Sequence, residues 1–123
     1  MKKNILLIED DELIRDLYKS VLIDKGYSVD AEATGELGFK ALRENQYDLL
    51  LLDLMLPDTN GLDILKKIKL EHLADSMKVV ILTNLGTEPI IKQAFSLGAD
   101  DYLTKVSLDP DQMVEKIAHF LPK

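Results

Sequence analysis

Short apolar runs alternate along this chain with longer stretches in which apolar residues recur every three or four positions. Continuous apolar runs of this length are typical of strands buried on both faces, whereas the spaced residues are typical of amphipathic helices. The pattern predicts five strands, each followed by a helix. The strands are expected at residues 5–8, 27–31, 49–52, 79–82 and 101–104, and the second of them is the least apolar.

Turn and cap residues bound the first two helices. Gly26 is expected to end the first helix, and Thr34 is suited to cap the second. Apolar residues at helical spacing define the face that each helix should bury. The residues predicted on these faces are Leu13, Ile14, Leu17, Val21 and Leu22 in the first helix, and Leu37, Ala41 and Leu42 in the second.

Similar signals mark the other three helices. The turn-forming residues 57–61 precede the third helix. Pro89 lies in the first turn expected for the fourth helix, and Gly98 follows its end. Asp109 and Gln112 predict a capping box at the start of the fifth helix.

The alternation of strand and helix predicts an α/β fold in which helices cover both faces of a parallel sheet. With 123 residues and no linker-like stretch, the chain is expected to form one domain, residues 1–123. Chain order alone does not give the order of the strands within the sheet.

Composition narrows the class of protein. Hydrophobic residues make up 46% of the chain and charged residues 30%, which is ordinary for a globular protein, and the lack of cysteine excludes disulfides and thiolate metal sites. The net charge of −7 argues against direct nucleic acid binding by this domain. There is neither an apolar run long enough to span a membrane nor a signal-peptide pattern, so we expect a cytoplasmic protein.

Polar residues with useful chemistry follow four of the five predicted strands. Glu9 and Asp10 follow the first, Asp53 the third, Thr83 the fourth and Lys105 the fifth. The carboxyl ends of parallel strands lie on one side of a sheet, so these side chains meet in one crevice if their strands are neighbours. Three carboxylates without histidine or cysteine suit a hard cation such as Mg²⁺. A lysine and a hydroxyl beside them suit a phosphoryl group, which makes Asp53 its candidate acceptor.

Each of these signals has a simpler explanation when taken alone. The acidic run 9–12 suits the first turn of a helix, where negative charge is favoured. Lys105 alone suits a solvated surface, and Thr83 alone suits a helix cap. Their joint placement at strand ends is what predicts a site.

The motifs of this chain resemble those of the receiver domains of two-component response regulators. The resemblance extends over residues 5–120. The segments that carry it are the acidic motif 8–11, the phosphoacceptor Asp53, the loop 56–57 with Gly61, the hydroxyl residue Thr83, the segment 98–102 and Lys105. It implies the (βα)5 flavodoxin-like fold of that family, with the strands in the order 2-1-3-4-5.

The resemblance also implies a chemistry. Asp53 would accept a phosphoryl group from a histidine kinase or a histidine phosphotransfer protein in a Mg²⁺-dependent reaction, and slow hydrolysis would follow. Asp10, Asp53 and the backbone carbonyl of Met55 would ligate the metal, with Glu9 holding a metal-bound water. Lys105 would offset the charge on the phosphoryl oxygens. Such a protein is a switch that catalyses only its own phosphorylation and dephosphorylation, not an enzyme with other substrates.

Thr83 and Tyr102 are the expected switch residues. By resemblance, Thr83 would bond a phosphoryl oxygen and Tyr102 would turn inward behind it. This movement would change the surface formed by the fourth helix, the fifth strand and the fifth helix, where a partner binds. Judged from the residues alone, Tyr102 could instead be a core residue with its hydroxyl at the surface.

Two positions depart from the family pattern. Val106 stands where the family most often has a proline in a cis peptide, and a cis bond to valine costs about 3 kcal/mol, so we expect a trans Lys105–Val106 bond. Asn84 stands where a small residue is usual. We hypothesise that Asn84, and Met55 near the acceptor, modulate the lifetime of the phosphoaspartate. A solvent-facing Asn84 without such an effect is the alternative.

The sequence says less about what the phosphorylated receiver would act on. Nothing after the fifth helix resembles an effector domain, so we expect a stand-alone receiver, with the receiver part of a longer DNA-binding transcriptional regulator as the alternative. Receivers of that subfamily dimerise through acidic–basic pairs. Asp100 and Asp101 match the acidic half, but Glu115, Lys116 and His119 stand where arginines are expected. We expect a monomer or a phosphorylation-dependent dimer.

Two other classes share parts of this pattern. A flavodoxin-like cofactor protein would have the same architecture, but Glu9 and Asp10 would repel the phosphate of the cofactor. A Mg²⁺-dependent phosphohydrolase would share the acidic site, but it usually has an acid or base beside the nucleophile, and Met55 supplies none. His72 and His119 fall within helices, and we expect them at the surface and not among the metal ligands.

Overall fold

The computed structural model describes residues 2–84, 88–105 and 109–121. Strand and helix alternate from β1 to α5. The strands are β1 (Asn4–Ile8), β2 (Ser28–Glu32), β3 (Leu49–Asp53), β4 (Lys78–Thr83) and β5 (Asp101–Thr104). The helices are α1 (Glu12–Asp24), α2 (Gly35–Glu44), α3 (Gly61–Leu70), α4 (Glu88–Ser96) and α5 (Pro110–Phe120). The trans peptide expected at Val106 lies outside the described residues.

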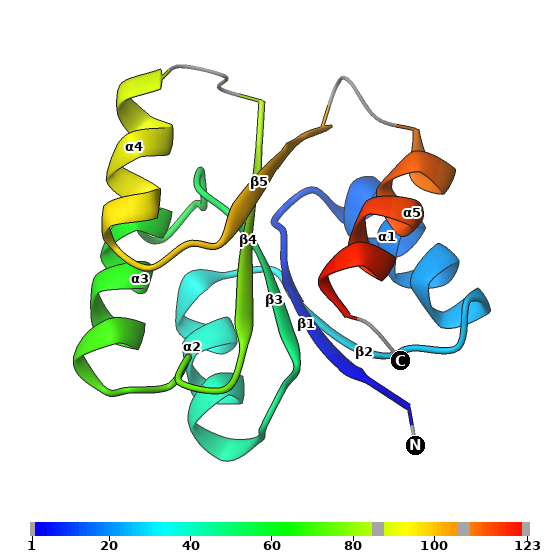
Figure 1. Ribbon diagram of the computed structural model, residues 1–123, viewed down its shortest axis with the longest axis horizontal. Helices are drawn as coiled ribbons and strands as arrows, with labels where there is room; N and C mark the ends of the chain where they lie inside the picture. Colours follow the sequence, from blue (N-terminus) through cyan, green and yellow to red (C-terminus); the bar gives the residue numbers. More distant parts are fainter. Residues whose placement is uncertain (1, 85–87, 106–108, 122–123) are drawn as a thin grey trace.

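The strands form one parallel sheet in the order β2-β1-β3-β4-β5, which confirms the predicted α/β fold and strand order. Helices α2, α3 and α4 cover one face of the sheet, and α1 and α5 cover the other (Figure 1). The strand order reverses between β1 and β3, because the chain goes out from β1 to β2 and returns past β1 to β3. In sheets of this kind, such a reversal opens a crevice at the carboxyl ends of the strands.

The central strands are apolar on both faces because each face is covered by helices. Alternate residues of a strand point to opposite faces, so one apolar run serves two cores. Leu6, Ile8, Leu50 and Leu52 belong to the core under α2, α3 and α4, whereas Ile5, Leu7, Leu49 and Leu51 belong to the core under α1 and α5. All eight side chains are fully buried, which explains why these runs show no polar alternation.

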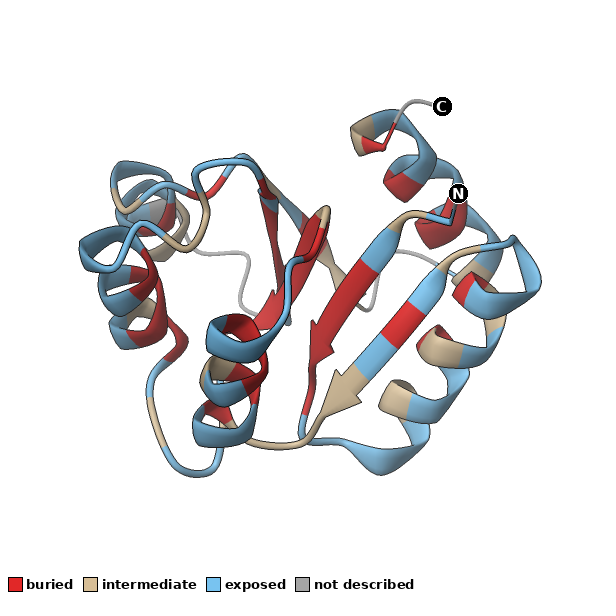
Figure 2. Ribbon diagram, turned by 90° about the horizontal axis from the view of Figure 1, so that it is seen from below, coloured by how far each residue is buried: buried red, intermediate tan, exposed pale blue. Residues whose placement is uncertain are grey.

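Strand β2 is the exception, as its weaker apolar pattern indicated. It lies at an edge of the sheet, pairs only with β1 and begins one residue later than predicted. Val29 is its one buried residue, and exposed and half-buried residues occupy the rest of the strand (Figure 2).

The buried faces predicted for α1 and α2 are only partly correct, because some of the residues assigned to them are exposed. Leu13, Leu17 and Leu37 are 82%, 47% and 47% exposed, although helical spacing placed them with the buried residues. Helix α1 instead buries Tyr18 and Leu22, an aromatic and an aliphatic side chain one turn apart. The buried face of α2 consists of Gly35, Gly38, Ala41 and Leu42. Because a Cβ on Gly38 would collide with Ile8, the small residues bring α2 against β1 and leave Leu37 outside.

The predicted helix ends are confirmed. Thr34 caps α2 by accepting a hydrogen bond from the Leu37 amide at 3.1 Å. Asp109 accepts from the Gln112 amide at 2.8 Å, and the Gln112 side chain accepts from the Asp109 amide at 3.2 Å, which completes the capping box of α5. No helix in the described parts of the chain is long and apolar enough to cross a membrane.

Candidate functional site

The strand order brings the predicted site residues together. Asp53 and Thr83 are the last residues of β3 and β4, and Glu9 and Lys105 directly follow β1 and β5. These four strands are consecutive neighbours in the sheet, and only β2 lies outside the group. Their carboxyl ends therefore form one crevice, as the sequence predicted.

Lys105 joins the two buried carboxylates of this crevice. Its Nζ lies 2.8 Å from Asp53 Oδ2 and also contacts Glu9 Oε1. The three side chains are 7%, 5% and 0% exposed for Lys105, Asp53 and Glu9. Charged groups removed from water to this extent need compensation, and here the ammonium supplies part of it.

The pKa values of Glu9 and Lys105 are both shifted in this crevice. Burial raises the pKa of Glu9 to about 7, although the Lys105 ammonium and a hydrogen bond from the Asp11 amide oppose the shift. Burial lowers the pKa of Lys105, but its hydrogen bonds to Asp53 and Glu9 raise it by more, so the net shift is upward. The lysine therefore stays charged at neutral pH, while Glu9 is poised to gain or lose a proton there.

The crevice has the ligands that a divalent cation needs. One carboxylate oxygen from each of Glu9, Asp10 and Asp53 lies within 4.8 Å of the others. Glu9 and Asp53 are buried, whereas Asp10 is exposed at the open side. Three carboxylates facing one lysine leave an excess of negative charge, and oxygen ligands of this kind suit Mg²⁺. The residues therefore fit the metal implied by the sequence.

Residues of the acidic run 9–12 have two different roles, because some belong to the crevice and others to the start of α1. Asp11 is the N-cap of α1 and accepts from the Ile14 amide at 3.0 Å, and its own amide donates to Glu9 Oε2 at 3.1 Å. Glu12 lies in the first turn of α1. Both explanations of this run are thus correct for different residues, because the chain turns from strand into helix within it.

Sequence reasoning missed Arg15. From α1 its Nη1 donates to the backbone carbonyls of Glu9 and Asp10, at 3.0 Å and 3.2 Å. These bonds fix the backbone of two predicted metal ligands. A basic residue one turn after an acidic strand end was the available signal, but spacing alone did not show that its side chain turns back.

The loop between β3 and α3 is closed by its own backbone. Met55 pairs with Asn60 in an isolated antiparallel bridge, and the Gly61 amide donates to the Leu54 carbonyl at 2.9 Å. The Met55 amide also donates to Asp53 Oδ1 at 3.0 Å. The carboxylate of Asp53 is therefore held at one oxygen by the loop and at the other by Lys105.

The predicted switch residues occupy different environments. Thr83 is buried at the end of β4, beside the crevice. Tyr102 is 39% exposed, and its ring meets Phe95 of α4 edge-on, with centroids 6.4 Å apart. The interpretation of Tyr102 as a core residue is therefore wrong, because β5 turns this side chain toward α4 and solvent. Asn84 is exposed directly after β4.

The remaining candidates lie away from the crevice. His72 and His119 are exposed, as expected, and neither belongs to the acidic cluster. Asp100, matched by sequence to the acidic half of a dimer interface, uses its carboxylate within the chain, because Oδ2 accepts from the Val79 amide at 2.7 Å.

The comparisons with known proteins agree with this fold. The family model of the response regulator receiver domain matches residues 5–118, and the chain belongs to this family. The chain is 38% identical over 120 residues to the transcriptional regulatory protein CrdR of Helicobacter pylori, covering 98% of this chain and 55% of CrdR. It is 38% identical over 104 residues to the transcriptional regulatory protein RprY of Bacteroides fragilis, covering 85% of this chain and 43% of RprY.

A solved structure gives the same result. A CheY-like response regulator receiver domain protein from Methanospirillum hungatei superposes with a TM-score of 0.89 at 31% identity, covering 97% of this chain and 93% of that one. The chain spans about half the length of the curated relatives named above. Those relatives are transcriptional regulatory proteins, and this chain belongs to the response regulator receiver domain family.

Proposed function

We propose that the protein accepts a phosphoryl group on Asp53 from a histidine kinase or a histidine phosphotransfer protein, in a Mg²⁺-dependent reaction. The observation that carries this proposal is the crevice in which Lys105 contacts Asp53, with the carboxylates of Glu9 and Asp10 in reach of a common cation. Membership of the receiver family supports the same chemistry.

The residues of the chain have distinct parts in this reaction. Asp10, Asp53 and the Met55 carbonyl would hold Mg²⁺, and Glu9 would hold a water bound to it. The metal would neutralise charge on the transferring phosphoryl oxygens. A carboxylate oxygen of Asp53 forms the new O–P bond as the N–P bond of the donor phosphohistidine breaks and the imidazole departs. Lys105, already 2.8 Å from this carboxylate, can follow the negative charge onto the phosphoryl oxygens.

The output of the reaction is a change at the surface formed by α4, β5 and α5. Thr83 would bond a phosphoryl oxygen, and Tyr102 would leave its exposed position against Phe95 and turn inward. Support for this movement comes from the half-exposed position of Tyr102, which leaves its side chain free of the core. A partner that binds only the phosphorylated or only the unphosphorylated state would then respond to phosphorylation.

The test is the intact mass of the protein after incubation with Mg²⁺ and acetyl phosphate, with Asp53→Asn alongside. We expect a Mg²⁺-dependent gain of one phosphoryl group that the variant lacks. An unchanged mass in a folded protein that binds Mg²⁺, also at the shortest times, would contradict phosphoryl acceptance. An equal gain in Asp53→Asn would show that another residue is modified.

For output, we propose a stand-alone receiver, formed by residues 1–123 as one domain, that binds a protein partner. The exposed residues Glu115, Lys116 and His119 of α5 support it, because they do not supply the arginines of the DNA-binding subfamily. Asp100 also uses its carboxylate within the chain. The alternative is the receiver part of a longer transcriptional regulator, and the names and lengths of the relatives favour it.

Sedimentation equilibrium with and without phosphorylation separates these outputs. A stand-alone receiver should remain a monomer in both states. Phosphorylation-dependent dimerisation that is lost on Asp101→Asn would favour the DNA-binding subfamily. Lys40→Met, a change of charge at an exposed position of α2, serves as the control away from the surface formed by α4, β5 and α5.

A further inference from the structure

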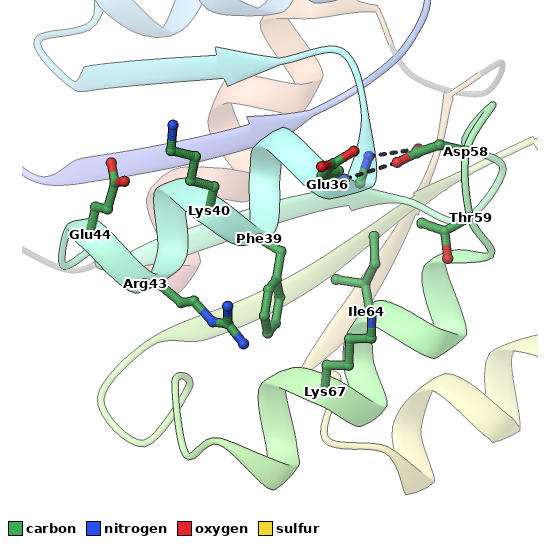
Figure 3. Close-up of a pocket in the computed structure, with 10 residues that line it drawn as sticks. Glu36, Phe39, Lys40, Arg43, Glu44, Asp58, Thr59, Ile64 and Lys67 are labelled. Atoms are coloured by element: carbon green, nitrogen blue, oxygen red, sulfur yellow. Dashed lines mark hydrogen bonds between the residues drawn. The ribbon is translucent and has the colours of Figure 1, made fainter.

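The carboxylate of Asp58 joins the loop after β3 to the start of α2. Its Oδ1 accepts from the Gly35 amide and its Oδ2 from the Glu36 amide, both at 2.9 Å (Figure 3). These are the first two residues of α2, and they lie more than twenty positions before Asp58 in the chain. Amides at the start of a helix have no partner within the helix, so an outside carboxylate is a strong acceptor for them.

The first turn of α2 thus divides its donors between two acceptors. The Leu37 amide bonds to Thr34, the local cap, whereas the first two amides bond only to the distant Asp58 in the described contacts. The two hydrogen bonds hold the pKa of Asp58 below its ordinary value, so this carboxylate stays ionised. Asp58 is itself exposed, and its hydrogen bonds to α2 are what orient it.

Side-chain packing reinforces this connection. A Cβ on Gly35 would collide with Thr59 Cγ2 and Ile64 Cδ1, so the start of α2 lies directly against the loop and the first turn of α3. A groove of about 660 Å³ continues from this contact between α2 and α3, and Asp58 lies at one end of it, beside the start of α2 (Figure 3).

The same loop and the same helix are each fixed to a predicted metal ligand. The loop carries Met55 and is closed by the Met55–Asn60 bridge, and Asp58 lies between the two bridge residues. Helix α2 is seated on β1 through Gly38, which touches Ile8, the residue before Glu9. Asp58 therefore connects the loop of Met55 with the strand end of Glu9 through α2.

We propose that Asp58 is a positioning residue for the metal site, holding the Met55 carbonyl at the correct distance from the carboxylates at the end of β1. This role rests on the proposed function, because Mg²⁺ is the group that it would serve. Residues that orient metal ligands without touching the metal commonly change metal affinity tenfold or more when they are removed.

The test compares Mg²⁺ affinity, measured by isothermal titration calorimetry, in Asp58→Ala and Thr34→Ala. Both variants remove a side-chain acceptor from the first turn of α2, but only Asp58 belongs to the loop. We expect Asp58→Ala to weaken Mg²⁺ binding about tenfold, and Thr34→Ala to leave it near the wild-type value. Asp58→Asn should recover part of the affinity, because its amide oxygen can still accept one of the two hydrogen bonds.

Amide hydrogen exchange in the metal-free protein supplies a second readout. The Gly61 amide closes the loop by donating to Leu54, so it should exchange faster in Asp58→Ala than in Thr34→Ala. Equal affinities and equal exchange rates in the two variants would overturn the role of Asp58 and leave phosphoryl acceptance untouched. A wild-type protein that binds no Mg²⁺ would overturn the proposed function, and with it the role of Asp58 toward the metal.

Discussion

Lys105 Nζ lies 2.8 Å from Asp53 Oδ2, and this contact joins two strand ends that are 52 residues apart in the chain. The same ammonium contacts Glu9 from a third strand end. One cation thus compensates two buried carboxylates at the point where metal and phosphoryl chemistry is proposed. The arrangement makes the stability of the site dependent on its charge balance.

Replacing Lys105 should destabilise the metal-free protein. Lys105→Met leaves two buried carboxylates without their cation, so we expect a loss of about 3 kcal/mol in the free energy of unfolding near neutral pH. Urea unfolding measures this loss, and Mg²⁺ should restore part of it by supplying another cation. Lys116→Met, at an exposed position of α5, is the control and should change stability little. Equal stabilities of the two variants would show that the contacts of Lys105 contribute nothing.

The raised pKa of Glu9 predicts a pH dependence of stability. Its value of about 7 in the folded protein lies above the ordinary value of 4.5. A carboxyl group of this kind favours the folded state fully below pH 4.5, and the contribution is lost as the pH rises through 7. In metal-free protein, the free energy of unfolding should therefore fall from about pH 5 to about pH 8 by more in wild type than in Glu9→Gln.

The same titration predicts a pH dependence of metal affinity. Mg²⁺ binding needs ionised carboxylates, so a proton on Glu9 competes with it. Calorimetric titrations should show tighter binding as the pH rises through 7 in wild type and a flatter profile in Glu9→Gln. Parallel profiles in the two proteins would rule out Glu9 as the titrating group.

Two leucines of α1 should differ sharply in their contribution to stability. Leu22 is fully buried, whereas Leu13 is 82% exposed. Leu22→Ala should lower the free energy of unfolding by about 3 kcal/mol, because it leaves a cavity under the sheet. Leu13→Ala should cost about 0.5 kcal/mol or less. Urea unfolding of both variants checks the orientation of α1, and similar losses would contradict it.

Asn84 offers a test of phosphoaspartate lifetime. It is exposed directly after Thr83, and we expect its amide to crowd or hydrogen-bond a phosphoryl group on Asp53 and so to change the rate of hydrolysis. Asn84→Ala should then lengthen the lifetime severalfold, as followed by intact mass after the donor is removed. Gln46→Ala, which precedes β3 at the opposite end of the sheet, is the control. An unchanged lifetime in Asn84→Ala would leave Asn84 as a solvent-facing residue without a role in hydrolysis.

The sequence by itself determined the secondary structure well, because its signals are local. An unbroken leucine run also suits a buried helix segment, but its short length between Asp48 and Pro57 favours a strand covered on both faces, and leucines 49–52 form such a strand. The helix caps at Thr34 and Asp109 could also be predicted from the sequence, because in each cap a side chain accepts a hydrogen bond from the amide three residues later. The strand-end positions of Asp53 and Lys105 followed from the same local pattern.

Helix orientation was decided only by tertiary packing. Helical spacing showed that α1 and α2 are amphipathic, but several residues compete for the buried face. Gly38 lets α2 approach Ile8 closely, and this approach turns Leu37 outward. A glycine carries no hydrophobic signal, so the sequence pattern did not identify Gly38 as part of the buried face and placed Leu37 there instead.

The side-chain connections around the site also required the three-dimensional structure. Arg15 turns back to the carbonyls of Glu9 and Asp10, and Asp58 crosses to the start of α2. Both are ordinary charged residues in the sequence, and nothing local shows which amide or carbonyl they reach. The sequence determined which residues stand at the strand ends, because strand formation is local. Only the fold decided which side chains hold those ends in place, because these contacts join segments that are distant in the chain.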